Sequence, residues 1–159
     1  MTEEEKCSKL KERVKLIFQK KPSIFCPYFN QEITLNSDGF HHLQFSSRRE
    51  RNKNEQILKF SLVPLAINII KKSGTIQEYR RGLCSVGKRS EKDGLALMKM
   101  VEYWGLVAIT GNNSIKIRVI LRKIGDGKII FWSVMPAIKL SQDKLEIMRH
   151  LAKQGIEDD

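Results

Sequence analysis

The chain has 159 residues, of which 29 are Lys or Arg and 18 are Asp or Glu, so its formal net charge is +11. Hydrophobic residues make up 41% of the chain and charged residues 30%, a balance that is typical of a globular domain and excludes a disordered tail or a fibre. This length predicts a single domain over residues 1–159 with a hydrophobic core of its own.

The same composition indicates the cellular compartment of the protein and the kind of partner that it binds. No apolar run approaches the roughly 18–20 residues that cross a bilayer, and the acidic first residues lack the apolar stretch of a secretory signal. Three cysteines without a CxxC pair argue against a disulfide framework or a zinc site, so we expect a cytoplasmic protein without membrane contact. The positive charge favours a polyanionic partner, most often nucleic acid, although a solvated lysine-rich surface would give the same count.

The first predicted element is a helix within residues 1–20. Leu10, Val14 and Ile17 recur at helical spacing and are separated by charged residues. Thr2 is a suitable N-cap, and the glutamates that follow it suit the positive end of the helix dipole.

The next two segments differ in character. Residues 24–46 read as extended, because β-branched and aromatic residues prevail there and a turn cluster lies at residues 36–39. Residues 54–81 read as a helical segment that is too apolar for a surface helix. Pro64 is expected to break this segment, either as a kink or as the first position of a second helix.

A less regular stretch follows. Ser73-Gly74 predicts a helix end, and we expect another short helix over residues 76–81. Residues 82–94 read as a basic loop, and residues 95–101 as a brief helix.

From residue 102 the hydrophobic period changes from helical to alternating. Three alternating runs over residues 102–136 predict an antiparallel β-meander, with two-residue turns at Asn112-Asn113 and Asp126-Gly127. A final helix is expected over residues 141–154, capped by Ser141. The predicted fold is therefore α+β, with N-terminal and central helices packed on a C-terminal antiparallel meander and with a C-terminal helix.

The register of the meander sorts its side chains onto two faces. A two-residue turn at Asp126-Gly127 would place Leu121 opposite Trp132 and Val119 opposite Val134, on a wholly apolar face. The other face would then carry Lys116, Arg118, Ile120, Arg122, Phe131, Ser133 and Met135. A one-residue bulge would instead move Trp132 onto this cationic face, and we prefer the first register because it leaves one face without charge.

A sheet face with fixed cations, a hydroxyl and an aromatic ring suits a phosphodiester. Arginine binds a phosphate through two donors, and an aromatic ring stacks on a base. The alternative is an amphipathic strand with its basic side chains in solvent, which we favour for Lys116 taken alone.

His41 and His42 are candidates for proton transfer, because histidine titrates near neutral pH. In an extended segment the two side chains would point to opposite faces, so only one of them is expected to act, and a structural or surface role is the alternative. The basic residues Arg48, Arg49 and Arg51 follow closely. No P-loop, HExxH or GxSxG motif and no acidic cluster occurs, so we expect neither a metal nor a cofactor.

Three features together resemble one nuclease family. They are Phe40-His41-His42-Leu43, the helical middle of the chain, and the closing strands that end in Phe131-Trp132-Ser133-Val134. The chain resembles the phage-associated branch of the barnase–EndoU–colicin–RelE-like (BECR-fold) nucleases over roughly residues 24–136, and its Phe-His-His-Leu stretch looks like the Phe-x-His-Leu signature of that branch.

The resemblance implies helices packed on a curved antiparallel sheet and metal-independent RNA cleavage, in which the ribose 2′-hydroxyl attacks the adjacent phosphate. It implies that His42, or His41, acts as general base or acid, that Arg118 and Arg122 stabilise charge on the phosphate, and that Ser133 donates a hydrogen bond to a phosphate oxygen. It further implies nucleic-acid-binding roles for Arg48, Arg49, Arg51, Lys116 and Phe131. Unlike barnase-like enzymes, the chain has no evident catalytic glutamate on the sheet.

Three functions remain open at this point. The first is a small endoribonuclease of phage, mobile-element or toxin type. The second is a non-catalytic, basic nucleic-acid-binding protein that uses the same face. The third is an interaction domain that forms a homodimer or binds an acidic protein partner.

Overall fold

A computed structural model describes residues 1–87, 89–109, 115–138 and 155–159. The elements in chain order are α1 (Glu3–Lys20), β1 (Ser23–Cys26), β2 (Gln31–Thr34), α2 (Ser37–His42), α3 (Lys53–Lys72), β3 (Glu78–Val86), β4 (Leu97–Ile109), β5 (Lys116–Ile124), β6 (Ile130–Ile138) and a short 3₁₀ helix, η2 (Ile156–Asp158). None of the helices among these residues is both long and apolar enough to span a membrane.

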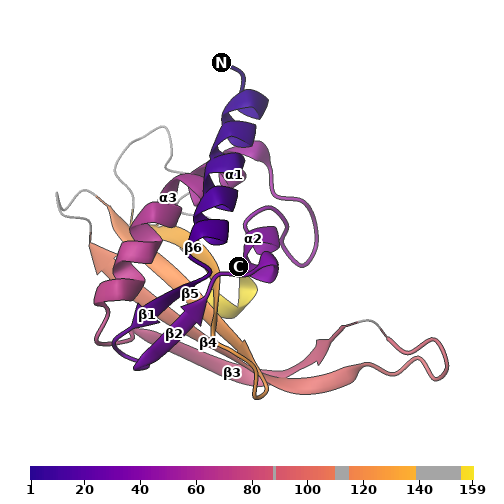
Figure 1. The fold of residues 1–159 in the computed structure, drawn as a ribbon. Coiled ribbons are helices and arrows are strands. Elements are labelled where there is room, and N and C mark those ends of the chain that lie inside the picture. The colour runs from indigo at the N-terminus through magenta and orange to yellow at the C-terminus, as the bar shows by residue number, and fades with distance from the viewer. Residues whose placement is uncertain (88, 110–114, 139–154) are drawn as a thin grey trace.

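One six-stranded sheet organises the fold, in the order β1-β2-β6-β5-β4-β3. The antiparallel meander of β4, β5 and β6 is confirmed, and the α+β fold class with it. The structure adds β3 on one side and the β1–β2 hairpin on the other, where β2 runs parallel to β6. Helices α1 and α3 lie together on one side of this sheet (Figure 1).

The predicted first helix is confirmed as α1. Thr2 and Glu5 form a reciprocal capping box at its start, and Cys7, Val14 and Phe18 are its buried residues. Helix α3, by contrast, is continuous from Lys53 to Lys72, so the alternative of a second helix that begins at Pro64 is wrong. Pro64 lies on the exposed side of the helix, and burial of the apolar residues around it stabilises the helix on both sides of the proline.

The extended reading of residues 24–46 is correct for β1 and β2 but wrong for α2. The side chain of Asn36 accepts a hydrogen bond from the backbone N–H of Gly39 and caps this short helix. Gly39 is needed for close packing, because a Cβ atom there would lie 2.1 Å from the backbone oxygen of Phe131. The two histidines therefore project from a helix.

The short helices expected over residues 76–81 and 95–101 are also wrong. These segments belong to β3 and β4, which pair in register as a long hairpin, with Leu83 opposite Met100. The predicted loop over 82–94 overlaps the second half of β3. Figure 1 shows the hairpin extending away from the rest of the molecule. Short apolar runs do not distinguish helix from strand, and here cross-strand pairing decides between them.

The turn between β5 and β6 is longer than predicted. Gly125 adopts a φ of +53°, the N–H of Gly127 donates to the carbonyl oxygen of Ile124 at 2.9 Å, and β6 begins only at Ile130. The predicted turn at Asn112-Asn113 and the predicted helix over 141–154 lie outside the described residues.

Candidate active site

A β-bulge at Trp132 sets the geometry of the site. Val119 pairs with Val134 as predicted, but Leu121 pairs with Phe131, so the expected pairing of Leu121 with Trp132 is wrong. The bulge turns Phe131 toward the helices, where its ring packs on Phe18 at 6.0 Å between centroids and is only 1% exposed. Phe131 is therefore not available to stack on a base, and Trp132 lies with Arg122 instead.

Trp132 links the early and late parts of the chain. The His42 ring stacks on it, with centroids 3.9 Å apart and planes 16° from parallel. The guanidinium carbon of Arg122 lies 4.1 Å from the Trp132 centroid, a cation–π contact. His41 is separate from this arrangement, since its exposed side chain stacks on Phe45 at 4.5 Å. Of the two adjacent histidines, His42 is thus the one that contacts the tryptophan on which Arg122 lies.

Arg51 fixes the protonation state and the tautomer of the His42 ring. Its Nε donates to the His42 carbonyl oxygen at 3.0 Å, and its Nη2 lies 3.1 Å from Nε2 of the ring. A guanidinium can only donate, so Nε2 accepts this bond and the imidazole is neutral with its proton on Nδ1. Burial lowers the pKa of His42 below the ordinary histidine value, and the negative charge of Asp159 offsets part of that effect.

Lys59 is a fully buried cation from the middle of α3. Its Nζ donates to Ser133 Oγ at 2.9 Å, to the Val134 carbonyl oxygen at 3.2 Å and to both carboxylate oxygens of Asp159 at 3.1 Å. Burial lowers the pKa of Lys59, although the charge of Asp159 opposes that change. Ser133, predicted to contact a phosphate oxygen, is itself fully buried on this ammonium.

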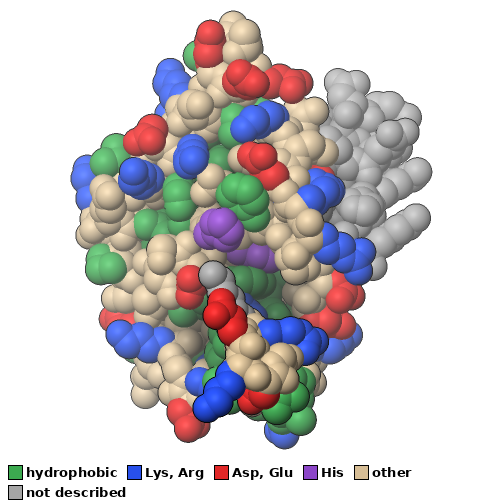
Figure 2. Space-filling model, turned by 90° about the vertical axis from the view of Figure 1, so that its right-hand side faces the viewer, with side chains coloured by type: hydrophobic (Ala, Val, Ile, Leu, Met, Phe, Trp, Pro, Cys, Tyr) green, Lys and Arg blue, Asp and Glu red, His purple; other side chains and the backbone are tan. Residues whose placement is uncertain are grey.

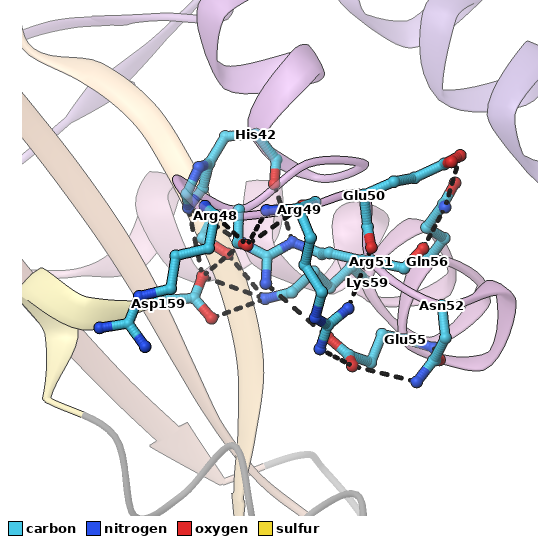
Figure 3. Close-up of polar contacts among 12 residues, drawn as sticks. His42, Arg48, Arg49, Glu50, Arg51, Asn52, Glu55, Gln56, Lys59 and Asp159 are labelled. Carbon is cyan, nitrogen blue, oxygen red and sulfur yellow. Dashed lines mark hydrogen bonds and ion pairs between the residues drawn. The ribbon is translucent and has the colours of Figure 1, made fainter.

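The side chains of His42, Arg51 and Lys59 all lie around the carboxylate of Asp159 (Figure 3). Its Oδ2 lies 3.6 Å from Arg51 Nη2 and 3.6 Å from His42 Nε2. Burial alone would raise its pKa, but Lys59, His42 and Arg51 together hold that pKa well below its usual range. His42, Arg51, Lys59 and Ser133 thus form a site for an ionised oxyanion, which we call the anion site.

A cleft of about 530 Å³ opens beside the anion site. It is lined by the loop from Ser46 to Arg49, by Arg51 and Glu55, and by Glu157–Asp159. Figure 2 shows the histidine side chains near the centre of this face, with acidic and basic side chains around them. Arg48 is exposed, whereas the guanidinium of Arg49 is paired with Glu55 at 3.2 Å.

Two predicted site residues lie elsewhere. Arg118 Nε is 2.6 Å from Glu78 Oε1, in an ion pair that crosses β4 where Gly105 has no side chain to obstruct it. Lys116 is at the opposite end of β5 from Arg122. The structure therefore brings together His42, Arg51 and Ser133, places Arg122 against the Trp132 ring on which His42 stacks, and separates these residues from Arg118 and Lys116.

The sequence reasoning missed Lys59 and Asp159, and it preferred the register without a bulge over the alternative, now confirmed, in which a bulge moves Trp132 toward Arg122. A lysine inside the apolar run of α3 is a signal for Lys59, because a buried cation needs partners. Asp159 gives no such signal, since it lies 100 positions from Lys59 in the sequence.

Among the described residues, no group of three or more His, Cys, Asp or Glu side chains lies together as metal ligands would. No protein-family model matches the chain, and no curated protein or solved structure matches it either. The residues of the site are therefore the basis for a functional assignment.

Proposed function

We propose that the protein is a ribonuclease that cleaves RNA by attack of the ribose 2′-hydroxyl on the adjacent phosphate. The observation that carries the proposal is the anion site. There the neutral imidazole of His42 and the buried cations Arg51 and Lys59 lie 3.1 to 3.6 Å from the carboxylate of Asp159. These are the groups that this reaction requires: a base for the hydroxyl and fixed positive charge for the phosphate.

The chemistry divides among three side chains. His42 accepts the proton of the 2′-hydroxyl at Nε2 after the Arg51 Nη2–H, which donates to that nitrogen, has turned to a phosphate oxygen, and the 2′-oxygen forms a bond to phosphorus. Arg51 and Lys59 stabilise the negative charge that develops on the phosphate oxygens, because they are already in place before the reaction. The bond from phosphorus to the 5′-oxygen then breaks, and that oxygen takes a proton from Lys59, whose acidity burial increases. The products are a 2′,3′-cyclic phosphate and a 5′-hydroxyl.

Two arginines are assigned to the RNA phosphates on either side of the cleaved bond. Arg122 lies on the Trp132 ring that His42 also contacts, where it can pair with a neighbouring phosphate. Exposed Arg48 lines the cleft that leads to the anion site, where it can pair with a second phosphate.

The test is incubation of the purified protein with single-stranded RNA in EDTA, with analysis of the product ends. We expect fragments with 2′,3′-cyclic phosphate ends from the wild type and a loss of about 100-fold or more in rate for His42→Ala. His41→Ala is the matched control, because the neighbouring ring is exposed and stacks outside the site. Intact RNA, or equal cleavage by His42→Ala, would overturn the proposal.

The charge of the chain supports a second candidate, a non-catalytic RNA-binding protein. With a net charge of +11 such a protein would bind RNA through phosphate contacts, and its affinity would fall steeply with salt. Salt-sensitive binding with the RNA recovered intact would favour this candidate over the enzyme.

A further inference from the structure

Asp159 and a phosphate group of RNA have the same binding requirements. We propose that the carboxylate of Asp159 occupies the phosphate position of the anion site, so that the segment Gly155–Asp159 and the substrate compete for the same cations. This inference rests on the proposed function and adds to it a phosphate-binding site that is blocked by the chain itself.

The contacts of the carboxylate are those of a bound phosphate. Lys59 donates to both of its oxygens, and Arg51 Nη2 lies 3.6 Å from one of them. Ammonium and guanidinium groups make the same charge-assisted bonds to carboxylate and to phosphate oxygens. The side chains of Asp159 and Lys59 have no exposed surface, so no substrate phosphate reaches Lys59 while Asp159 is in place.

Few contacts hold the rest of the segment. Ile156 is fully buried, and its Cγ2 lies 3.5 Å from the position that a Cβ of Gly105 would take. Glu157 is 3.9 Å from Arg80 in an exposed ion pair, which adds little. Among the described residues, the segment thus depends mainly on one apolar anchor and one carboxylate, and it borders the cleft through which RNA would arrive. The inference requires that this segment leave the site while the sheet stays intact.

The direct test is binding of inorganic phosphate by full-length Asp159→Asn, measured by calorimetry and by thermal unfolding against sodium chloride of equal ionic strength. The amide keeps the size of the side chain but loses its charge, so the segment binds the cations less tightly and phosphate displaces it more easily. We expect Asp159→Asn to bind phosphate about tenfold or more tightly than the wild type, because the site is no longer mostly occupied by its own chain. Its melting temperature should rise with phosphate accordingly.

Asp158→Asn is the matched control, since Asp158 is an exposed neighbour with the same charge. It should bind phosphate as the wild type does. Ile156→Ala gives a second measurement if Asp159→Asn does not fold, because it weakens the anchor and leaves every charge in place; it too should bind phosphate more tightly. Unchanged phosphate affinity in Asp159→Asn and Ile156→Ala would overturn the inference.

RNA cleavage separates this inference from the proposed function. Faster cleavage by Asp159→Asn supports both. Tighter phosphate binding without cleavage by any variant leaves the blocked phosphate site standing and refutes the ribonuclease. Cleavage by the wild type that is lost in Asp159→Asn, without a gain in phosphate affinity, shows instead that Asp159 is needed for the reaction and refutes the competition.

Discussion

Arg51 donates two hydrogen bonds to His42, one to its carbonyl oxygen at 3.0 Å and one to Nε2 of its ring at 3.1 Å. The pair of bonds fixes both the tautomer and the direction of the imidazole. Trp132 then supports the ring from its face at 3.9 Å. A histidine held in this way is neutral and fixed in direction, and in the proposed reaction its Nε2 becomes the base when the Arg51 Nη2–H turns to a phosphate oxygen.

The first prediction concerns pH. The pKa of folded His42 lies below the ordinary value of 6.5, so the unfolded state takes up its proton first as the pH falls. The free energy of unfolding should therefore decrease as the pH drops through about 6.5 toward the lower folded value. Urea unfolding between about pH 5 and pH 7.5 measures this slope, and His42→Gln should flatten it.

His41→Gln is the control for that experiment, because His41 is exposed on the neighbouring position of α2. Asp159 does not interfere in this range, since its own contribution is lost only near and below its ordinary pKa of 3.8. An identical slope in the wild type and His42→Gln would show that burial does not lower the pKa of His42.

The second prediction concerns the pair of Lys59 and Asp159. Lys59→Met should cost about 3–5 kcal/mol of stability, because it leaves a buried carboxylate without its main partner. Lys59→Met combined with Asp159→Leu should cost less than the two single changes added together, since neither charge then remains. A double-mutant cycle by urea unfolding checks this, and additive effects would contradict the buried pair.

The third prediction concerns Gly39. Its replacement by Ala would place a Cβ 2.1 Å from the Phe131 carbonyl oxygen, so α2 must move away from β6. We expect a loss of about 1–3 kcal/mol in stability and a larger loss of RNA cleavage, because His42 moves with α2. Gly82→Ala is the control, since nothing lies within 4 Å of its Cβ position. Equal stability of the two variants would refute the close contact.

The fourth prediction separates the two arginines of β5. Arg122→Gln should lower kcat/KM for RNA by about tenfold, the value of one charge-assisted contact. Arg118→Gln should change it by less than about twofold, because the Arg118 guanidinium is paired with Glu78 on the far side of Gly105. Equal losses in both variants would place the substrate along the whole strand rather than at the Trp132 end.

Most of the fold could be predicted from the spacing of the hydrophobic residues and from the residue types that are typical of turns. The spacing of Val14 and Ile17 gave α1, and the alternation after residue 102 gave the meander. Helix α2 was missed because a six-residue helix rests on one cap, from Asn36, rather than on a repeating pattern. Strand β3 was missed because it is defined by its pairing with β4, which is a tertiary contact, and because none of its residues is fully buried.

The site was predictable in part. His42 and Ser133 could be selected from the sequence because proton transfer and phosphate binding need those residue types. Their neighbours depend on one bulge that decides the direction of Trp132 and Phe131. The sequence allowed registers with and without this bulge, and the hydrophobic run alone did not decide between them. Asp159 joins the site only through tertiary packing.

The most direct test of the account uses oligodeoxynucleotides that carry one ribonucleotide, in four versions with A, C, G or U as the single ribose. In EDTA the wild-type protein should cut at least one version, only on the 3′ side of the ribose, and leave a 2′,3′-cyclic phosphate, while the all-deoxy control stays intact. Cleavage of the all-deoxy strand, or a cut that leaves no cyclic phosphate, would contradict attack by the 2′-hydroxyl at His42.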